Sequence, residues 1–204
     1  MKHISSILLL LLASLNLWAQ EESKPEPAFK MPHTLIKMAP LQFFRNTFEL
    51  GLESFDYDYK RSANLDLGYR SGSSEWEDAQ GYHVEIGYRR YAPAMVYKTR
   101  GDHNFYRGLY YGLSVRGEYF EGHTTNNSFN DYGMKVKSLA PGFTLGWQKT
   151  LWEAIVLDVY LGGSVRFSKT EYVDGNSTQE SFSIFDPRYE GIMPKVGVKI
   201  GIAL

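Results

Sequence analysis

Residues 155–167 alternate between apolar side chains and polar or small ones, and this pattern constrains the fold more than any other feature of the chain. Successive side chains of a strand point to opposite faces of a sheet, so a period of two predicts a β-strand. One face is mostly aliphatic and aromatic, whereas the other combines Asp158 and Arg166 with Gly162 and Ser164. A narrow closed barrel, with lipid outside and a packed polar lumen inside, accommodates both faces.

The same alternation recurs along the chain and predicts about eight strands. We therefore predict an all-β fold, a closed antiparallel up-and-down transmembrane β-barrel of about eight strands, within residues 33–204. Pro40 interrupts the first strand, which is typical of an edge strand or a bulge. The predicted strands span residues 35–43, 48–53, 65–70, 82–89, 109–119, 142–148, 155–167 and 195–204.

The connections between the predicted strands differ in length in a regular way. Outer-membrane barrels have short periplasmic turns and longer extracellular loops. Long polar connections follow the third, fifth and seventh strands, at residues 71–80, 121–132 and 170–191. We expect these three to be extracellular and to contact an unknown ligand. The connections at 57–61 and 150–153 are short, as periplasmic turns should be, whereas 92–105 is long and departs from the pattern.

A soluble, lipocalin-like barrel is the alternative architecture, because it would place the apolar face inside and the charged face outside. The glycines favour the membrane barrel. Glycines such as Gly68, Gly146 and Gly197 share the charged face of their strands. A crowded interior explains small residues on that face, whereas a face in contact with solvent does not need them.

The N-terminal residues have the pattern of a secretory signal peptide, with a short polar start and an unbroken apolar run at residues 7–12. We predict a signal peptide at residues 1–19, cleaved after Ala19, and a flexible periplasmic lead-in at residues 20–32. An uncleaved anchor is the alternative, but the apolar stretch is shorter than the roughly 20 residues that a spanning helix needs. The predicted location is the outer membrane, in contact with its lipid.

Composition excludes several classes of function. The net charge is −1, which gives no electrostatic basis for binding nucleic acid. The chain has no cysteine, so disulfides, thiol catalysis and cysteine-based metal sites are absent. No motif indicates a cofactor or a metal ion, and we expect neither.

The face predicted to line the lumen carries many charges of both signs. One interpretation is an ion path or a binding site, and the other is a packed interior in which neighbouring charges neutralise each other. A barrel of eight strands has an interior just wide enough for side chains to fill, which favours the second. The predicted lumen charge network comprises Glu85, Arg89, Arg116, Glu118, Asp158, Arg166, Lys195 and Lys199.

Two groups around histidines could carry chemistry. His83 and Glu85 share one face of a predicted strand, where they could form half of a metal site or a hydrogen-bonded element of the lumen. His123 and Thr125 follow Glu121 in a predicted outer loop and resemble the arrangement of a lipid A deacylase, a membrane-barrel esterase. Nucleophilic catalysis needs a hydroxyl, a base and a group that orients the base, but threonine is a rare nucleophile. We expect no catalytic residues.

Three segments resemble a known family. They are Gly-Leu-Tyr-Tyr-Gly-Leu-Ser-Val-Arg-Gly-Glu-Tyr at 108–119, Gly-Trp-Gln-Lys-Thr-Leu at 146–151 and Pro-Lys-Val-Gly-Val-Lys-Ile-Gly at 194–201. With the signal peptide, they resemble small Bacteroidetes-type outer-membrane β-barrels of unknown function, similar in architecture to the OmpA transmembrane domain and OmpX. The resemblance implies a closed eight-stranded barrel without catalytic residues. Members usually end in an aromatic residue, whereas this sequence ends at Leu204, a departure from the pattern that bears on the efficiency of insertion.

These features together predict a monomeric structural or adhesion-type surface protein that acts through its extracellular loops. The alternatives are a lipid-modifying outer-membrane enzyme that uses His123, and a narrow channel. Loop binding is inferred here from architecture alone.

Overall fold

The computed structural model describes residues 33–57, 59–71, 73–74, 77–92, 108–126, 130–151, 154–172 and 188–204. All of them belong to one compact unit of the chain, residues 32–204. The predicted signal peptide and lead-in, residues 1–32, lie outside the described residues. In the part of the chain that is described, no helix is long and apolar enough to cross a membrane.

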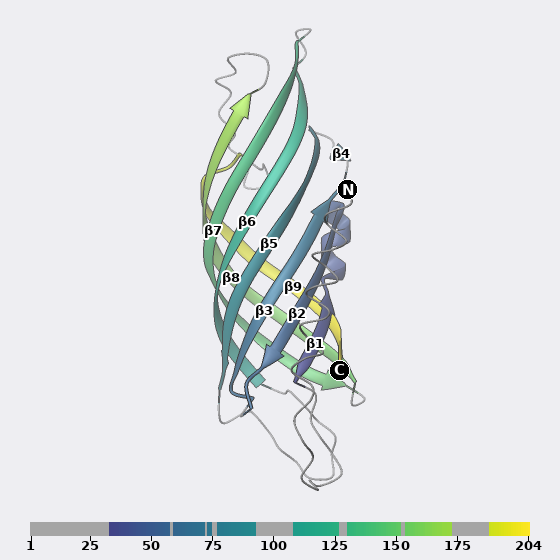
Figure 1. Cartoon of the computed structure of the whole chain (residues 1–204), viewed down its shortest axis with the longest axis vertical. Helices are drawn as coiled ribbons and strands as arrows, with labels where there is room; N and C mark the ends of the chain where they lie inside the picture. Colours follow the sequence, from purple (N-terminus) through teal and green to yellow (C-terminus); the bar gives the residue numbers. More distant parts are fainter. Residues whose placement is uncertain are drawn as a thin grey trace, which may run out of the picture. The chain divides into compact units, whose positions relative to one another are not determined.

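Eight strands form a closed antiparallel up-and-down barrel, as predicted, and a ninth strand of two residues extends one hairpin (Figure 1). Neighbours in the chain are neighbours in the barrel, and β9 pairs with β1 to close it. The strands are β1 (Thr34–Met38), β2 (Thr47–Phe55), β3 (Arg61–Arg70), β4 (Ser73–Ser74), β5 (Glu77–Tyr91), β6 (Gly108–Asn126), β7 (Asn130–Leu151), β8 (Ile155–Tyr172) and β9 (Gly191–Ala203).

The first predicted strand is wrong beyond Met38. The chain leaves β1 there and forms a 3-10 helix, η1 (Pro40–Arg45), with the proline in its first turn. Proline lacks an N–H for the ladder and has the φ that a helix start requires, so it ends β1 and begins η1. Asn46 then adopts a left-handed conformation, with φ 52° and ψ 32°, which returns the chain into β2.

The prediction of outer loops at residues 71–80 and 121–132 is wrong for most of their described residues, which belong to strands. β6 and β7 continue to Asn126 and Asn130 and pair along their whole length. β4 and β5 likewise pair between Ser73 and Asp78. Polar side chains do not end a strand, because the backbone of an aligned neighbour continues to offer hydrogen bonds. In the third predicted loop, β8 reaches Tyr172, and residues 173–187 lie outside the described residues.

The connections predicted to be short are short. β2 and β3 are joined by a tight turn in which the Asp56 N–H donates to the Arg61 carbonyl at 3.0 Å. β7 ends at Leu151 and β8 begins at Ile155. These turns lie at the lower end of the barrel as drawn in Figure 1, opposite the β6–β7 hairpin. The unexpectedly long connection at 92–105 lies outside the described residues, apart from Ala92.

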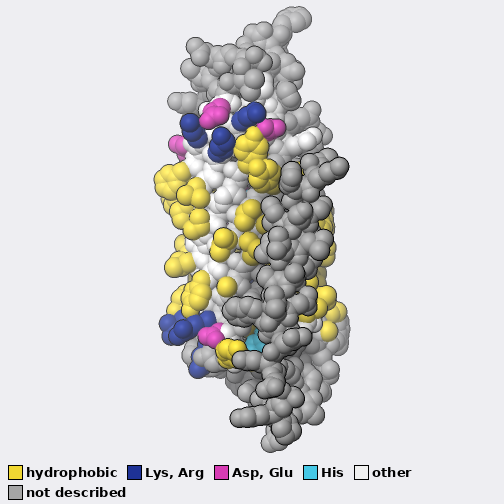
Figure 2. Space-filling view, in the orientation of Figure 1, with side chains coloured by type: hydrophobic (Ala, Val, Ile, Leu, Met, Phe, Trp, Pro, Cys, Tyr) yellow, Lys and Arg dark blue, Asp and Glu magenta, His cyan; other side chains and the backbone are white. Residues whose placement is uncertain are grey.

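The two faces of the sheet point as predicted for a membrane barrel. On β8, Leu161 is 61% and Phe167 60% exposed, whereas Asp158 is fully buried and Arg166 is 7% exposed. A lipocalin-like arrangement would be the reverse. Exposed apolar side chains form a belt around the visible face (Figure 2). Members on several strands are Ile36, Leu50, Leu67, Ile86, Leu113, Phe143, Leu161 and Val196.

Charged side chains border the apolar belt at both ends (Figure 2). At the upper end, exposed Lys135 and Lys137 of β7 are neighbours of exposed Glu171 and Lys169 of β8. We call this group, together with Glu121 of β6, the upper rim. At the lower end, exposed Arg61 of β3 is paired in register with exposed Arg90 of β5. The belt therefore has two sharp polar boundaries.

Glycines on the inner face make room for large polar side chains. A Cβ atom added to Gly146 would collide with the Tyr110 ring, and one added to Gly197 would collide with the Tyr160 ring. By contrast, a Cβ added to Gly117, which alternates to the outer face of β6, would meet nothing within 4 Å. This difference supports the crowded interior predicted from the positions of the glycines.

Candidate functional site: the charged lumen

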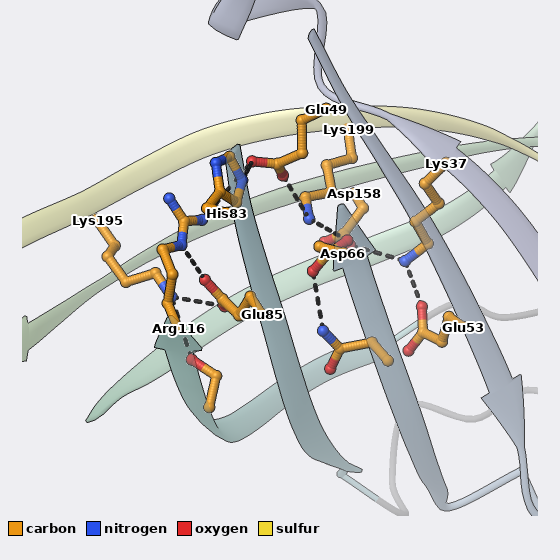
Figure 3. A network of polar contacts seen from close by, with 12 residues as sticks. Lys37, Glu49, Glu53, Asp66, His83, Glu85, Arg116, Asp158, Lys195 and Lys199 are labelled. Carbon is orange, nitrogen blue, oxygen red and sulfur yellow. Dashed lines mark hydrogen bonds and ion pairs between the residues drawn. The ribbon is translucent and has the colours of Figure 1, made fainter. Parts of the chain in front are cut away.

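The lower half of the lumen contains a cluster of two cations and two carboxylates, Lys37, Arg89, Glu53 and Asp158. Figure 3 shows Lys37, Glu53 and Asp158 of this cluster. Asp158 Oδ2 lies 2.8 Å from Lys37 Nζ and 2.7 Å from Arg89 Nη1. Glu53 also pairs with Lys37, and it lies 3.4 Å from Arg89. Each of the two carboxylates therefore pairs with both cations.

Neutral polar groups complete the lower cluster. The Tyr110 hydroxyl donates to Asp158 Oδ1 at 2.7 Å, and Lys37 Nζ donates to Gln148 Oε1 at 2.6 Å. Ser62 and Tyr91 hydroxyls donate to Glu53 Oε1 at 2.5 and 2.9 Å. Hydrogen bonds to ionised groups are stronger than neutral ones, and they compensate part of the cost of removing these charges from water.

A larger cluster fills the middle of the lumen. Lys199 Nζ lies 2.9 Å from Glu49 and 2.7 Å from Asp66. Arg116 Nε donates to Glu85 Oε2 at 2.6 Å, and its Nη2 lies 3.6 Å from Glu49. In Figure 3 these side chains converge from different strands toward the barrel interior.

The middle cluster continues upward through two further cations. Lys195 Nζ donates to Glu85 Oε1 at 2.7 Å, so that Glu85 is held between Lys195 and Arg116. Arg166 Nη2 lies 2.6 Å from Glu118 Oε2, and Glu118 is 3.9 Å from Arg116. In this cluster, four cations (Lys195, Lys199, Arg116 and Arg166) meet four carboxylates (Glu49, Asp66, Glu85 and Glu118).

Charge balance explains how so many ionised groups are tolerated. Removing an ion from water costs several kcal/mol, which an ion pair offsets only with good geometry and further hydrogen bonds. Both clusters have equal numbers of cations and carboxylates in ion pairs, and the pairs are supported by tyrosine, serine and amide groups. In this arrangement the cations and the carboxylates neutralise each other.

The lumen is closely packed between these groups. A cavity between the clusters, lined by Asp66, Glu85, Arg89, Arg116 and Lys199 among others, has a volume of about 10 Å³. That volume is on the order of what one water molecule requires. Above the clusters, Phe120, Met134 and Val136 form a buried apolar group on the inner face. Side chains therefore fill the space between the two clusters, as expected for an eight-stranded barrel.

The structure places all eight residues of the predicted network on the inner face, within ion-pair distance of at least one charged partner. It divides them between the two clusters, with Arg89 and Asp158 in the lower one. It also includes Glu49, Glu53 and Asp66, which alternation places on the charged face of their strands, and it adds Lys37, which the sequence analysis missed. Lys37 alternates with Ile36 and Met38, so this pattern could have predicted that Lys37 faces the lumen. The pattern was hard to recognise because Pro40 suggested a longer, irregular strand.

The candidate acid–base pair of His83 and Glu85 is not formed. His83 Nε2 instead lies 3.0 Å from Glu49 Oε2, on a neighbouring part of the sheet, while Glu85 binds Arg116 and Lys195. His83 is therefore a hydrogen-bonded element of the lumen. Among the described residues, no group of three or more histidine and acidic side chains could hold a metal ion.

The candidate enzyme residues lie at the upper end of β6. His123 and Thr125 are paired in register with Gly133 and Asp131, and their side chains lie outside the described residues. The exposed Glu121 accepts a hydrogen bond from the Tyr119 hydroxyl and lies 3.2 Å from Lys135 Nζ. These donors lower the pKa of the Glu121 carboxyl. The described partners of Glu121 are thus a tyrosine and a lysine.

Fold and interior together define a class: a closed eight-stranded antiparallel barrel with a buried charged network and an apolar outer belt. Comparisons of the chain with protein-family models, with curated proteins and with solved structures found no match. The barrel implied by the resemblance is confirmed, but no match identifies the family.

Proposed function

We propose that this chain is an outer-membrane barrel whose closed body is a scaffold for binding at the cell surface. The observation that carries the proposal is the orientation of the two faces. Apolar side chains such as Leu113 and Leu161 face outward, while charged ones such as Glu85 and Asp158 are buried. In water this arrangement would be unfavourable on both faces, whereas a bilayer suits it.

The dimensions of the apolar belt agree with this proposal. On β6 the outward-facing residues from Leu109 to Tyr119 lie between the lower end and the upper rim. A tilted strand needs about 9–11 residues to cross a bilayer. The polar rims would then lie at the two membrane surfaces.

The proposed binding surface comprises the three segments predicted to be extracellular, residues 71–80, 121–132 and 170–191. Their described parts include the upper ends of β6, β7 and β8. Function is often carried by connecting segments held on such a scaffold. The monomer is expected to suffice, since one chain closes the barrel.

Cell fractionation combined with heat-modifiable gel migration tests the location. We expect the chain in the outer-membrane fraction, with faster migration before boiling than after it. N-terminal sequencing of the purified chain should begin at Gln20 if residues 1–19 are removed as a signal peptide. Recovery as a soluble periplasmic monomer without detergent would contradict the proposal.

Planar-bilayer recording separates the scaffold from a channel. The close packing around Arg116, Arg89 and Glu85 supports a closed lumen, so we expect no stable conductance from the wild-type chain. Glu85→Ala should lower stability without creating ion-selective steps. Stable wild-type steps whose selectivity changes in Glu85→Ala would overturn the scaffold and establish a channel.

A further inference from the structure

Two arginines lie opposite each other on neighbouring strands at the lower border of the apolar belt. Arg61 of β3 and Arg90 of β5 are paired in register, and both side chains are exposed. The Tyr91 N–H donates to the Lys60 carbonyl at 2.8 Å, so residues 60 and 91 form a hydrogen-bonded pair. Arg61 and Arg90 are the adjacent, non-hydrogen-bonded pair, in which the Cα atoms are about 4.5 Å apart and the side chains lie closer together. Like charges in this position destabilise a sheet.

The described part of the chain offers this arginine pair no counter-ion. Asp56 lies across from Arg61, since its N–H donates to the Arg61 carbonyl at 3.0 Å. The Asp56 carboxylate, however, accepts a hydrogen bond from the Tyr57 N–H at 2.7 Å and holds the turn. Neither guanidinium has an ion pair among the described residues, and Asp58 of the same turn lies outside them.

The upper rim provides a comparison within the same molecule. Lys137 of β7 and Lys169 of β8 are also paired in register and exposed. There, Glu171 lies 3.9 Å from Lys137 and 3.3 Å from Lys169, so one carboxylate neutralises both lysines. The described residues contain no such carboxylate for the arginine pair at the lower border. An anion from outside the chain would neutralise that pair in the same way.

The position of the arginine pair on the barrel wall limits what such an anion can belong to. From these arginines toward the upper rim, the outward-facing positions within residues 63–69 of β3 and 82–88 of β5 are all apolar or aromatic. A tilted strand crosses a bilayer in about 9–11 residues, so these two rows are long enough for one hydrocarbon core. In the proposed membrane location, the two guanidinium groups would therefore lie at the level of the lipid head groups.

Two tyrosines flank the arginine pair on the outer face. Tyr111 of β6 is paired in register with Arg90, and Tyr88 lies two positions from Arg90 on β5. Their side chains are 52% and 48% exposed. Tyrosine is typical of the membrane interface, because its ring is apolar and its hydroxyl is polar. Two guanidinium groups beside tyrosine hydroxyls are donors suited to the oxygens of one phosphodiester.

We propose that Arg61 and Arg90 bind the phosphate of one anionic phospholipid of the periplasmic leaflet, with its acyl chains against the apolar wall above them. The inference rests on the proposed outer-membrane location. A zwitterionic head group fits less well, because it would bring a further cation beside the two arginines. An acidic peptide also fits less well, because it has no acyl chains to cover the apolar wall and the rings of Tyr88 and Tyr111.

Unfolding in vesicles of two compositions tests the proposal through a change of sign. In phosphatidylcholine, Arg90→Gln removes the repulsion from Arg61, so the urea midpoint of unfolding should equal or exceed that of the wild type. In phosphatidylglycerol, the same variant loses a head-group contact, so its midpoint should fall below the wild-type value. Native mass spectrometry of chains released from mixed vesicles should show phosphatidylglycerol retained about fivefold less well, the effect of one basic residue at an anionic surface. Arg61→Gln should behave in the same way.

Lys169→Gln is the matched control, because it removes one lysine from the pair that Glu171 already neutralises. It should change neither the retention of phosphatidylglycerol nor the sign of the stability difference between the two lipids. The same reversal in Lys169→Gln, or equal effects of Arg90→Gln in both lipids, would overturn the inference.

Soluble anions distinguish the lipid from other occupants. Free glycerophosphoglycerol or a polyglutamate peptide, added to the phosphatidylcholine vesicles, should not make the wild type more stable than Arg90→Gln. If either one does, the site binds a soluble anion or an acidic peptide, and the lipid is ruled out. Failure of the proposed location is a separate result, because the wild type would then insert into neither kind of vesicle and would show no heat-modifiable migration.

Discussion

At the scale of single residues, the lumen depends on shared partners. Asp158 binds Lys37, Arg89 and the Tyr110 hydroxyl, and Glu85 binds Arg116 and Lys195. A carboxylate with two cations cannot be lost without leaving an excess of buried positive charge. Individual residues of the network should therefore be far more sensitive to substitution than equally charged residues on the rims.

Asp158→Ala tests this sensitivity. Removal of one partner from a buried pair costs about 3–5 kcal/mol, because the remaining charge is uncompensated. We expect a loss of that size in the free energy of unfolding, measured by urea titration in lipid vesicles. Glu171→Ala, which removes an exposed carboxylate of the upper rim, should change stability by less than about 1 kcal/mol. Similar losses in the two variants would show that the lumen charges are not buried as described.

Glycine positions offer a second test at this scale. Gly146→Ala places a methyl group where the Tyr110 ring lies, so we expect a destabilisation of about 1–3 kcal/mol from overpacking. Gly117→Ala places the same group in open space on the outer face, and its effect should stay within about 0.5 kcal/mol. Thermal unfolding of both variants in the same detergent compares them. Equal tolerance at both sites would contradict a crowded lumen.

At the scale of the strand, the two faces of β8 have opposite requirements. Leu161→Arg places a charge on the outer face, near the middle of the apolar belt. In a bilayer we expect it to destabilise the barrel by about 2–4 kcal/mol. Lys169→Arg, on the same face at the upper rim, should be neutral. Unchanged stability of Leu161→Arg in lipid would mean that this face does not contact hydrocarbon.

Strand faces could be predicted from the sequence because each depends only on local alternation. Leu161 and Asp158 are assigned to opposite faces by counting positions. Strand ends could be predicted where a tight turn reverses the chain, as before Arg61. Strand ends predicted from the start of a polar segment were wrong, because β6 and β7 continue through residues 121–126 and 130–132. The first strand ends earlier than predicted, because Pro40 begins η1 after β1 has ended at Met38.

Partners within the lumen could not be predicted in the same way. Which cation meets which carboxylate depends on the stagger between distant strands, and alternation does not encode it. His83 and Glu85 are two positions apart yet bind different partners, Glu49 and Arg116. The short pairing between β1 and β9 was equally hidden, because it results from the difference in length between these strands.

At the scale of the whole molecule, closure depends on a short seam. β1 and β9 pair at only four positions, including Ile36 with Ile202. Both side chains face outward, and paired Cα atoms lie at a separation of roughly 5.5 Å, which a disulfide can bridge. The chain has no native cysteine, so an engineered bond would be unambiguous.

The double variant Ile36→Cys and Ile202→Cys should therefore oxidise within one chain. After boiling without reductant, the linked chain should migrate faster than the reduced one, because it is nearly circular. Ile36→Cys combined with Val196→Cys is the control, since these positions are not paired, and it should show no such shift. Failure of the first pair to link would place the seam in a different register.

The long separations within the lumen network also have a consequence for the order of assembly. Lys37 and Asp158 are 121 positions apart, and Lys195 and Glu85 are 110 apart. These partners meet only once the first and last strands have come together. In the proposed membrane location, a partly assembled sheet would expose unneutralised charges to hydrocarbon, at a cost that grows with each strand added. In that location, insertion and closure should therefore be one concerted event, without a stable half-barrel.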